Sequence, residues 1–142
     1  MVVAYTPAAG QDIDVKGVQG WDFSRSKWNS DGLIPVVVQD VETQTVLMVA
    51  YMNEEALKIT LQENRACYFS RSRQSLWRKG ETSGHVQEVV SLAFDCDYDT
   101  LLLTVKQTGN ACHEDYFTCF HNILTGEGFV QREDLKTRHN LR

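Results

Sequence analysis

The chain has 142 residues and a formal net charge of −5, with 42% hydrophobic and 23% charged residues, which is typical of one ordinary globular domain. The net negative charge argues against sequence-independent binding to nucleic acid, and no run approaches the roughly 20 apolar residues of a membrane span, so we expect neither partner. Because no secretory signal pattern is present, we expect a cytoplasmic protein whose four cysteines are reduced and serve metal ligation, catalysis or core packing.

The first half of the chain predicts an arm, a hairpin and a helix. Residues 1–30 are low in pattern, and we interpret them as an N-terminal arm. Two β-rich runs, residues 33–38 and 45–51, flank a polar connection and predict a hairpin. Asn53 is a good N-cap and two glutamates follow it, which predicts a short helix.

The second half predicts further strands. Strand-like runs cover residues 66–70, 85–94, 100–107 and 116–123, whereas residues 71–84 are polar and without periodicity. Residues 125–142 are charged and apolar-poor, and we expect a frayed or partly helical C-terminal tail. We therefore predict a mainly β (α+β) fold, with a compact single domain of several antiparallel strands and one short helix over residues 31–124.

An acidic segment lies between two predicted strands. In extended backbone, alternate residues face opposite sides, so Asp95, Asp97 and Asp99 would share one face and Cys96 would point to the other. Converging carboxylates repel one another unless a cation lies among them, and oxygen ligands favour Mg²⁺ or Ca²⁺. The alternative is a solvated acidic turn, because aspartate is common in turns.

Cysteines suggest a second metal site. Three thiolates, from Cys96, Cys112 and Cys119, could hold zinc and leave its fourth position to water, whose pKa zinc lowers to about 7. Because no Cys-x-x-Cys pair occurs, three core cysteines are the alternative. His113 is a candidate for proton transfer or ligand orientation, with an ordinary histidine as the alternative.

A basic loop combines arginines and a lysine with hydroxyl residues, glycines and a tryptophan. Arginine forks and glycine-flexed amides suit phosphate oxygens, and an indole face can stack on a base. The loop is not a Walker motif, and a solvated basic loop is the alternative. The candidate ligand-binding residues are Arg71, Arg73, Trp77, Arg78, Lys79, Thr82, Ser83 and His85.

Six segments together resemble the phosphoribosyl-AMP cyclohydrolase family in order and spacing. The resemblance runs from about residue 31 to residue 124, and the run from Trp77 to His85 is its most specific part. The segments are residues 32–35, 51–57, 70–73, 76–85, 95–99 and 111–120.

The resemblance implies an activity, two metals and an assembly. The reaction would be hydrolytic opening of the N1–C6 bond of the adenine ring in phosphoribosyl-AMP by a zinc-activated water, the third step of L-histidine biosynthesis. Zn²⁺ and Mg²⁺ would be the cofactors, and an intertwined homodimer would share its zinc site between chains. The ligands implied are Asp95, Asp97 and Asp99 for Mg²⁺, and Cys96, Cys112 and Cys119 for Zn²⁺. His113 would move protons, and the basic cluster would hold the two substrate phosphates.

The chain also departs from the family pattern. The family usually has a glycine, and often a basic residue, between its last two cysteines, whereas residues 114–118 here are Glu-Asp-Tyr-Phe-Thr. Cys67 matches no ligand position, and we expect it in the core. Many relatives carry a second, pyrophosphohydrolase domain; the residues after 124 are too few for one, so we expect a monofunctional chain.

The sequence fits three other classes of protein less well. A zinc nucleobase deaminase would need His-x-Glu and Pro-Cys-x-x-Cys, which are absent. A zinc-stapled, non-catalytic binding module would need a closed set of four ligands, and only three matching cysteines are evident. A thiol redox protein would need closely paired cysteines. The cyclohydrolase is therefore the leading hypothesis, with the zinc-stapled module as its alternative.

Overall fold

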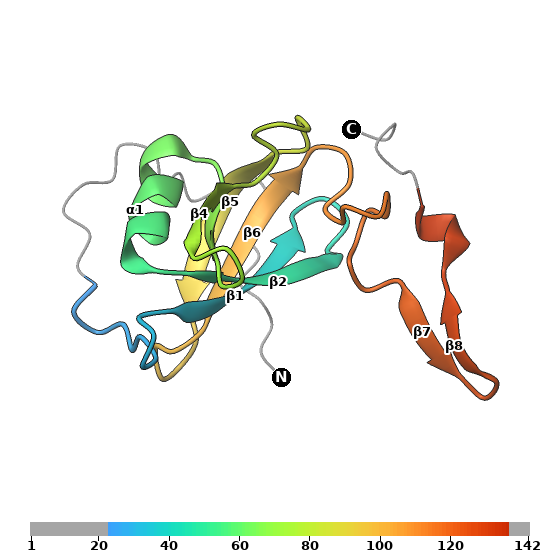
Figure 1. The fold of residues 1–142 in the computed structure, drawn as a ribbon, viewed down its shortest axis with the longest axis horizontal. Coiled ribbons are helices and arrows are strands. Elements are labelled where there is room, and N and C mark those ends of the chain that lie inside the picture. Colours follow the sequence, from blue (N-terminus) through green and yellow to red (C-terminus); the bar gives the residue numbers. More distant parts are fainter. Residues whose placement is uncertain (1–22, 137–142) are drawn as a thin grey trace.

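Four strands form the main sheet of the computed structural model, which describes residues 23–136 (Figure 1). Their order is β2-β1-β6-β5, with β1 at Ile34–Asp40, β2 at Val46–Met52, β5 at Gln87–Phe94 and β6 at Leu101–Gln107. Each hairpin, β1–β2 and β5–β6, is antiparallel, but β1 and β6 run parallel at the centre of the sheet. The mainly β prediction is confirmed. The sheet is nevertheless mixed, because a helix and a further hairpin separate the two paired units along the chain.

Alternation along the central strands places the core on one face of the sheet. Ile34, Val36 and Val38 of β1 are fully buried, and Leu101 and Leu103 of β6 match them in register. This period of two is what a sheet with one packed face requires. The buried face is covered by the helix and by the β3–β4 hairpin (Figure 1).

The helix α1, Glu54–Glu63, begins where its N-cap predicts. The Asn53 side chain accepts a hydrogen bond from the Ala56 amide at 2.8 Å, and two glutamates occupy the first turn. Asn64 ends the helix in the left-handed conformation, at φ 57°. The Thr60 hydroxyl then links the helix to the next strand, because it accepts the Cys67 amide at 2.9 Å. Cys67 is fully buried, so its placement in the core is confirmed.

Two strands form a second, smaller sheet beside the helix. β3 (Cys67–Ser70) pairs with β4 (Ser75–Arg78) in antiparallel register. β3 was predicted, but β4 lies in the polar segment in which no strand was expected. It is short and mostly polar, so its strand character depends on pairing rather than on hydrophobic periodicity.

The C-terminal part differs from its prediction. Residues 116–121 are not a strand; they follow the surface of the core, with Phe117 buried and the Cys119 amide bonded to the Leu47 carbonyl at 2.8 Å. A hairpin of β7 (Asn122–Thr125) and β8 (Gly128–Gln131) follows, and then a 3₁₀ turn at Glu133–Leu135. The frayed or helical tail predicted from residue 125 is therefore wrong for residues 125–131. The hairpin extends away from the main sheet (Figure 1).

Part of the predicted N-terminal arm lies outside the described residues, namely residues 1–22. The remainder contacts the domain. Phe23 and Trp28 pack against the core, and the Lys27 amide donates to the Tyr98 carbonyl at 2.8 Å. Within residues 23–136, no helix is long and apolar enough to cross a membrane.

A chain of hydrogen bonds runs through the core from Tyr68 to Asp40. The buried Tyr68 hydroxyl donates to the Gln87 side chain at 2.5 Å, and Gln87 donates to Gln107 at 2.8 Å. The backbone amide of Gln107 donates to the Asp40 carboxylate at 3.2 Å, and this carboxylate also accepts two hydrogen bonds from Thr43 in the β1–β2 turn. Burial raises the pKa of Tyr68 well above its usual value, so the phenol remains a donor.

We expect Gln87→Leu to lower the free energy of unfolding by about 1–3 kcal/mol, because the Tyr68 hydroxyl and the Gln107 side chain lose their buried partner. Urea unfolding measures the change. The double variant Tyr68→Phe/Gln87→Leu should recover part of the lost free energy of unfolding, since it no longer buries a Tyr68 hydroxyl without a partner. Strictly additive losses would contradict a coupled network.

Candidate active site

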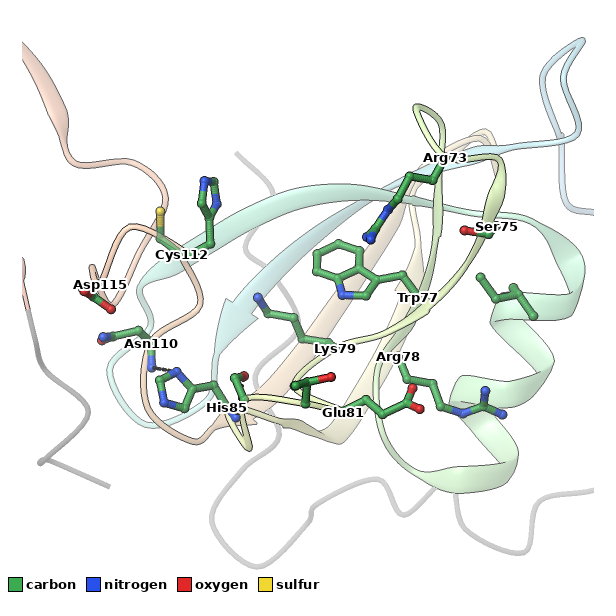
Figure 2. Close-up of a pocket in the computed structure, with 15 residues that line it drawn as sticks. Arg73, Ser75, Trp77, Arg78, Lys79, Glu81, His85, Asn110, Cys112 and Asp115 are labelled. Carbon is green, nitrogen blue, oxygen red and sulfur yellow. Dashed lines mark hydrogen bonds between the residues drawn. The ribbon is translucent and has the colours of Figure 1, made fainter.

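Two short stretches enclose a cavity of about 490 Å³ at one end of the main sheet (Figure 2). The first contains β4 and the turn that follows it, and the second follows β6. Figure 2 shows the side chains of Arg73, Trp77 and Lys79 directed into the same space, with Cys112 across from them. The lining residues that were predicted from sequence are Arg73, Trp77, Arg78, Lys79, Thr82, Ser83, His85, Cys112 and His113.

Lys79 connects the two stretches. Its ammonium donates to the Ala111 carbonyl at 2.5 Å and lies 5.2 Å from the centre of the Trp77 ring. Burial lowers the pKa of Lys79, and the neighbouring Cys119 and Cys112 thiols act in the opposite direction. The cavity therefore contains a cation against an aromatic face, a pair that suits a phosphorylated aromatic ligand.

Gly80 allows the turn that places His85. Its φ is +78°, and a Cβ there would lie 2.4 Å from the carbonyl carbon of His85. Gly109, at φ +67°, lies against the His85 ring in the same way, with a Cβ 2.8 Å from the ring. The His85 Nδ1 accepts the Asn110 amide at 3.3 Å, so in the neutral ring Nε2 carries the proton. The close packing of two glycines and one hydrogen bond from a backbone amide thus fix the imidazole at the cavity wall.

The predicted basic residues divide into three groups. Arg78 forms a two-bond ion pair with Glu63 of the helix, at 3.1 and 2.9 Å, and Figure 2 shows its guanidinium directed away from Lys79. Arg71 does not line the cavity; its guanidinium lies 4.1 Å from the centre of the Tyr51 ring. Arg73 and Lys79 form the third group, because both line the cavity and direct their side chains into it (Figure 2).

The two C-terminal cysteines lie close together. The buried Cys112 thiol contacts Cys119, and desolvation together with Cys112 raises the pKa of Cys119 to about 11. A thiol with a raised pKa that lies against a second thiol favours a cation that stabilises the thiolates, and soft sulfur ligands suit zinc. Cys112, Glu114 and His121 also bring possible ligand atoms within 4.8 Å of one another. The donor set therefore fits zinc.

The acidic segment is a turn rather than the extended strand assumed from its alternation, because Tyr98 adopts a left-handed φ of 63°. The Asp95 carboxylate accepts hydrogen bonds from the backbone amides of Asp99 at 3.0 Å and Thr100 at 3.2 Å. Desolvation raises the pKa of Asp95, but the hydrogen bonds outweigh it, so the pKa lies below its usual value. Hydrogen bonding with Asp95 and Asp97 raises the pKa of Asp99. The three carboxylates still converge within 4.8 Å, and this oxygen set fits Mg²⁺.

Cys96 does not join the other two cysteines within one chain. Its turn lies at the start of β6, where the Asp95 amide is bonded to the Thr100 carbonyl, whereas Cys112 follows the end of β6. The seven residues of β6 separate those ends by roughly 20 Å. The acidic turn and the thiol pair therefore occupy opposite ends of the sheet.

Some cavity residues were missed from the sequence. Asn110 and Asp115 line the cavity, and nothing in their local pattern marked them. The sequence indicates no role for His121, yet it is 2% exposed and lies beside Cys112. The loop between the last two cysteines, which departs from the family pattern, places Tyr116 and Phe117 in the interior.

Comparison with known proteins identifies the family. The family model described as phosphoribosyl-AMP cyclohydrolase matches residues 48–121. The chain belongs to the phosphoribosyl-AMP cyclohydrolase family. A relative of this name from Alkalilimnicola ehrlichii is 57% identical over 101 residues, which cover 71% of each chain. The relative from Archaeoglobus fulgidus is 55% identical over 71% of this chain and 94% of its own, and that from Pelotomaculum thermopropionicum 52% identical over 78% and 85%. The predicted membership of this enzyme family is confirmed.

We expect Gly80→Ala to destabilise the fold more than Gly84→Ala. Both glycines have positive φ, 78° and 82°, but a Cβ at Gly84 meets nothing within 4 Å. Gly84→Ala should cost about 1–2 kcal/mol for the backbone conformation alone, and Gly80→Ala that amount plus a backbone clash. Urea unfolding of both variants measures the difference. Equal losses would show that close packing on His85 is not required.

Proposed function

We propose that the chain catalyses hydrolytic opening of the N1–C6 bond of the adenine ring in phosphoribosyl-AMP, giving the ring-opened imidazole carboxamide ribotide. This is the third step of L-histidine biosynthesis, and we place it in the cytoplasm. One observation carries the proposal: a single cavity brings a cationic and aromatic wall, Lys79 and Trp77, together with Cys112 and His113. The 52–58% identity to relatives named phosphoribosyl-AMP cyclohydrolase supports it.

The cavity wall orients the substrate. The Trp77 indole offers a face for the purine ring, because every base has a face that can stack. Arg73 and Lys79 supply the charge that holds phosphate oxygens, with Thr82 and Ser83 on the same turn as hydroxyl donors. The cavity volume of about 490 Å³ is within the range of small-molecule sites. The reacting end of the purine would then lie toward Cys112 and His113.

Two metals complete the proposed site. Cys112, Cys119 and Cys96 would hold Zn²⁺, and Asp95, Asp97 and Asp99 would hold Mg²⁺. Zinc bound there would activate a water molecule for attack on C6. His113 is exposed, lies next to Cys112 and lines the cavity, so it can take a proton from the attacking water and deliver one to N1.

We propose a homodimer in which the zinc site is shared between the two chains. The length of β6 supports this, because one chain cannot bring Cys96 to Cys112. Exposed apolar side chains give further support, since Leu124 is 68% exposed and Phe129 75%. Apolar surface of this kind is typical of an interaction face. The partner would then place Cys96 at the other chain's thiol pair.

A zinc-stapled binding module without catalysis is the competing function. Such a module needs a closed metal site and has no need of a cavity beside the thiolates. The cavity that reaches Cys112 and His113 favours the hydrolase.

Turnover of phosphoribosyl-AMP, followed by ultraviolet absorbance on metal-analysed protein, tests the function. Activity should fall on removal of zinc with a chelator and return when zinc is added in the presence of Mg²⁺, because water activation needs the metal. Protein that carries full zinc and Mg²⁺ but shows no turnover would contradict the hydrolase and favour the binding module.

The contrast between two arginines tests the assignment of the phosphate site. Arg73→Ala should raise KM about 10- to 100-fold, because a charged hydrogen bond contributes roughly 1.5–3 kcal/mol. Arg71→Ala is the matched control: its guanidinium lies on Tyr51 and outside the cavity, so KM should change little. Steady-state kinetics at fixed metal content measures both. An equal rise in KM would place Arg71 in the substrate site.

A further inference from the structure

His121 is a buried histidine that the proposed reaction does not use. It is 2% exposed, and its ring is stacked on the Tyr116 ring at 3.6 Å between ring centres, with an interplanar angle of 9°. A buried imidazole loses the hydrogen bonds that water would give it, so the protein atoms around its two nitrogens decide which of them carries the proton.

The Nε2 atom of His121 faces the Cys112 sulfur. The two atoms are 3.7 Å apart, which is within hydrogen-bonding range for the large sulfur atom. Glu114 Oε1 also lies 3.7 Å from Nε2, but a nitrogen–oxygen separation of this length is too long for a hydrogen bond. The sulfur is therefore the hydrogen-bond partner of Nε2.

The other ring nitrogen fixes the direction of this hydrogen bond. His121 Nδ1 is buried and has no hydrogen-bond partner in the part of the chain that the structure describes. A proton on Nδ1 would leave a donor buried without an acceptor, whereas a proton on Nε2 leaves only an unused lone pair on Nδ1. Unpaired buried donors are the rarer of the two. The neutral ring therefore carries its proton on Nε2 and donates it to Cys112.

Hydrogen bonds of the surrounding backbone and of Tyr116 hold the imidazole against this sulfur. The Cys112 amide donates to the Tyr116 carbonyl at 3.1 Å, which ties the residue with the sulfur to the residue with the stacking ring. The Tyr116 hydroxyl in turn donates to Glu133 at 2.6 Å, and the Arg132 amide donates to the His121 carbonyl at 2.8 Å. The sulfur, the stacking ring and the imidazole are thus fixed relative to one another.

We propose that His121 is a positioning residue for Cys112: its Nε2–H donates to the sulfur and holds that sulfur as an oriented thiolate for the metal. The inference rests on the proposed thiolate zinc site. His121 acts through Cys112 in this assignment and is neither a metal ligand nor a catalytic residue.

Such a hydrogen bond adjusts the metal as well as the ligand. Three thiolates give zinc so much negative charge that it polarises a water molecule less, and an N–H directed at one sulfur draws part of that charge back. His121→Phe should therefore lower kcat about 10- to 100-fold at full zinc content, which is the usual contribution of a residue that hydrogen-bonds to a ligand. KM should change little, because other residues line the cavity.

Nitrogen NMR of the unsubstituted protein, loaded with cadmium-113 and labelled in histidine, tests the hydrogen bond itself. The proton should remain on Nε2 of His121 and show scalar coupling to cadmium through the sulfur. A direct coupling between Nε2 and cadmium would show that His121 is a ligand, and the absence of any coupling would show that the hydrogen bond does not form. Either of these two results would overturn the inference.

Cobalt spectra of three variants give a second readout. His121→Phe keeps a ring on Tyr116 but removes the N–H, so the thiolate-to-cobalt charge-transfer band should move to lower energy. His121→Gln keeps an N–H of similar reach and should return both the band and kcat toward their original values. Phe120→Leu, at the neighbouring side chain that is 52% exposed, is the matched control and should leave the band in place.

The outcomes separate the role of His121 from the zinc site. An unshifted band in His121→Phe, or equal bands in His121→Phe and His121→Gln, would overturn the inference and leave the zinc site standing. Absence of any thiolate band from the unsubstituted protein would instead refute the proposed zinc site, and the role of His121 with it. If His121→Phe does not fold, the cadmium measurement decides, because it needs no substitution.

Discussion

The position of β6 between β1 and β5 determines where both candidate sites lie. Its parallel pairing with β1 and antiparallel pairing with β5 fix its direction, and its buried side chains anchor it in the core. The acidic turn precedes the first residue of β6, and the segment that contains Cys112 and Cys119 follows its last residue. Because a paired strand cannot shorten, the carboxylates and the thiols stay apart within a chain. A site that needs both ends must therefore be built from two chains.

The cavity wall depends on backbone conformations that few residues permit. The turn after β4 packs its Gly80 against the backbone of His85, while Gly109 makes room for the imidazole from the other stretch. Lys79 then joins the stretches through the Ala111 carbonyl. These contacts mean that the wall is preorganised: the cation, the indole and the imidazole keep their relative places without a ligand, which reduces the ordering that binding would require.

Much of the fold could be predicted from local patterns. The β1–β2 hairpin, the Asn53 cap and the two long strands follow from alternation and capping, which are properties of adjacent residues. β4, the β7–β8 hairpin and the parallel β1–β6 pair could not, since each depends on pairing with a segment remote in sequence or on side chains that carry no strong pattern. The same division holds at the site. The loop from Trp77 to His85 was found by its chemistry, whereas Asn110 and His121 have meaning only through the neighbours that folding supplies.

Within residues 23–136, the cavity is lined by side chains from two short stretches alone, residues 73–85 and 110–115. Ligand preference can therefore change through substitutions confined to these stretches, or through their exchange between relatives. Substitutions in the sheet have only to keep the volume of its core. The two stretches must nevertheless change in step, because Lys79 belongs to one and its carbonyl partner to the other. Descent in this lineage would then leave paired changes across the cavity and independent ones elsewhere.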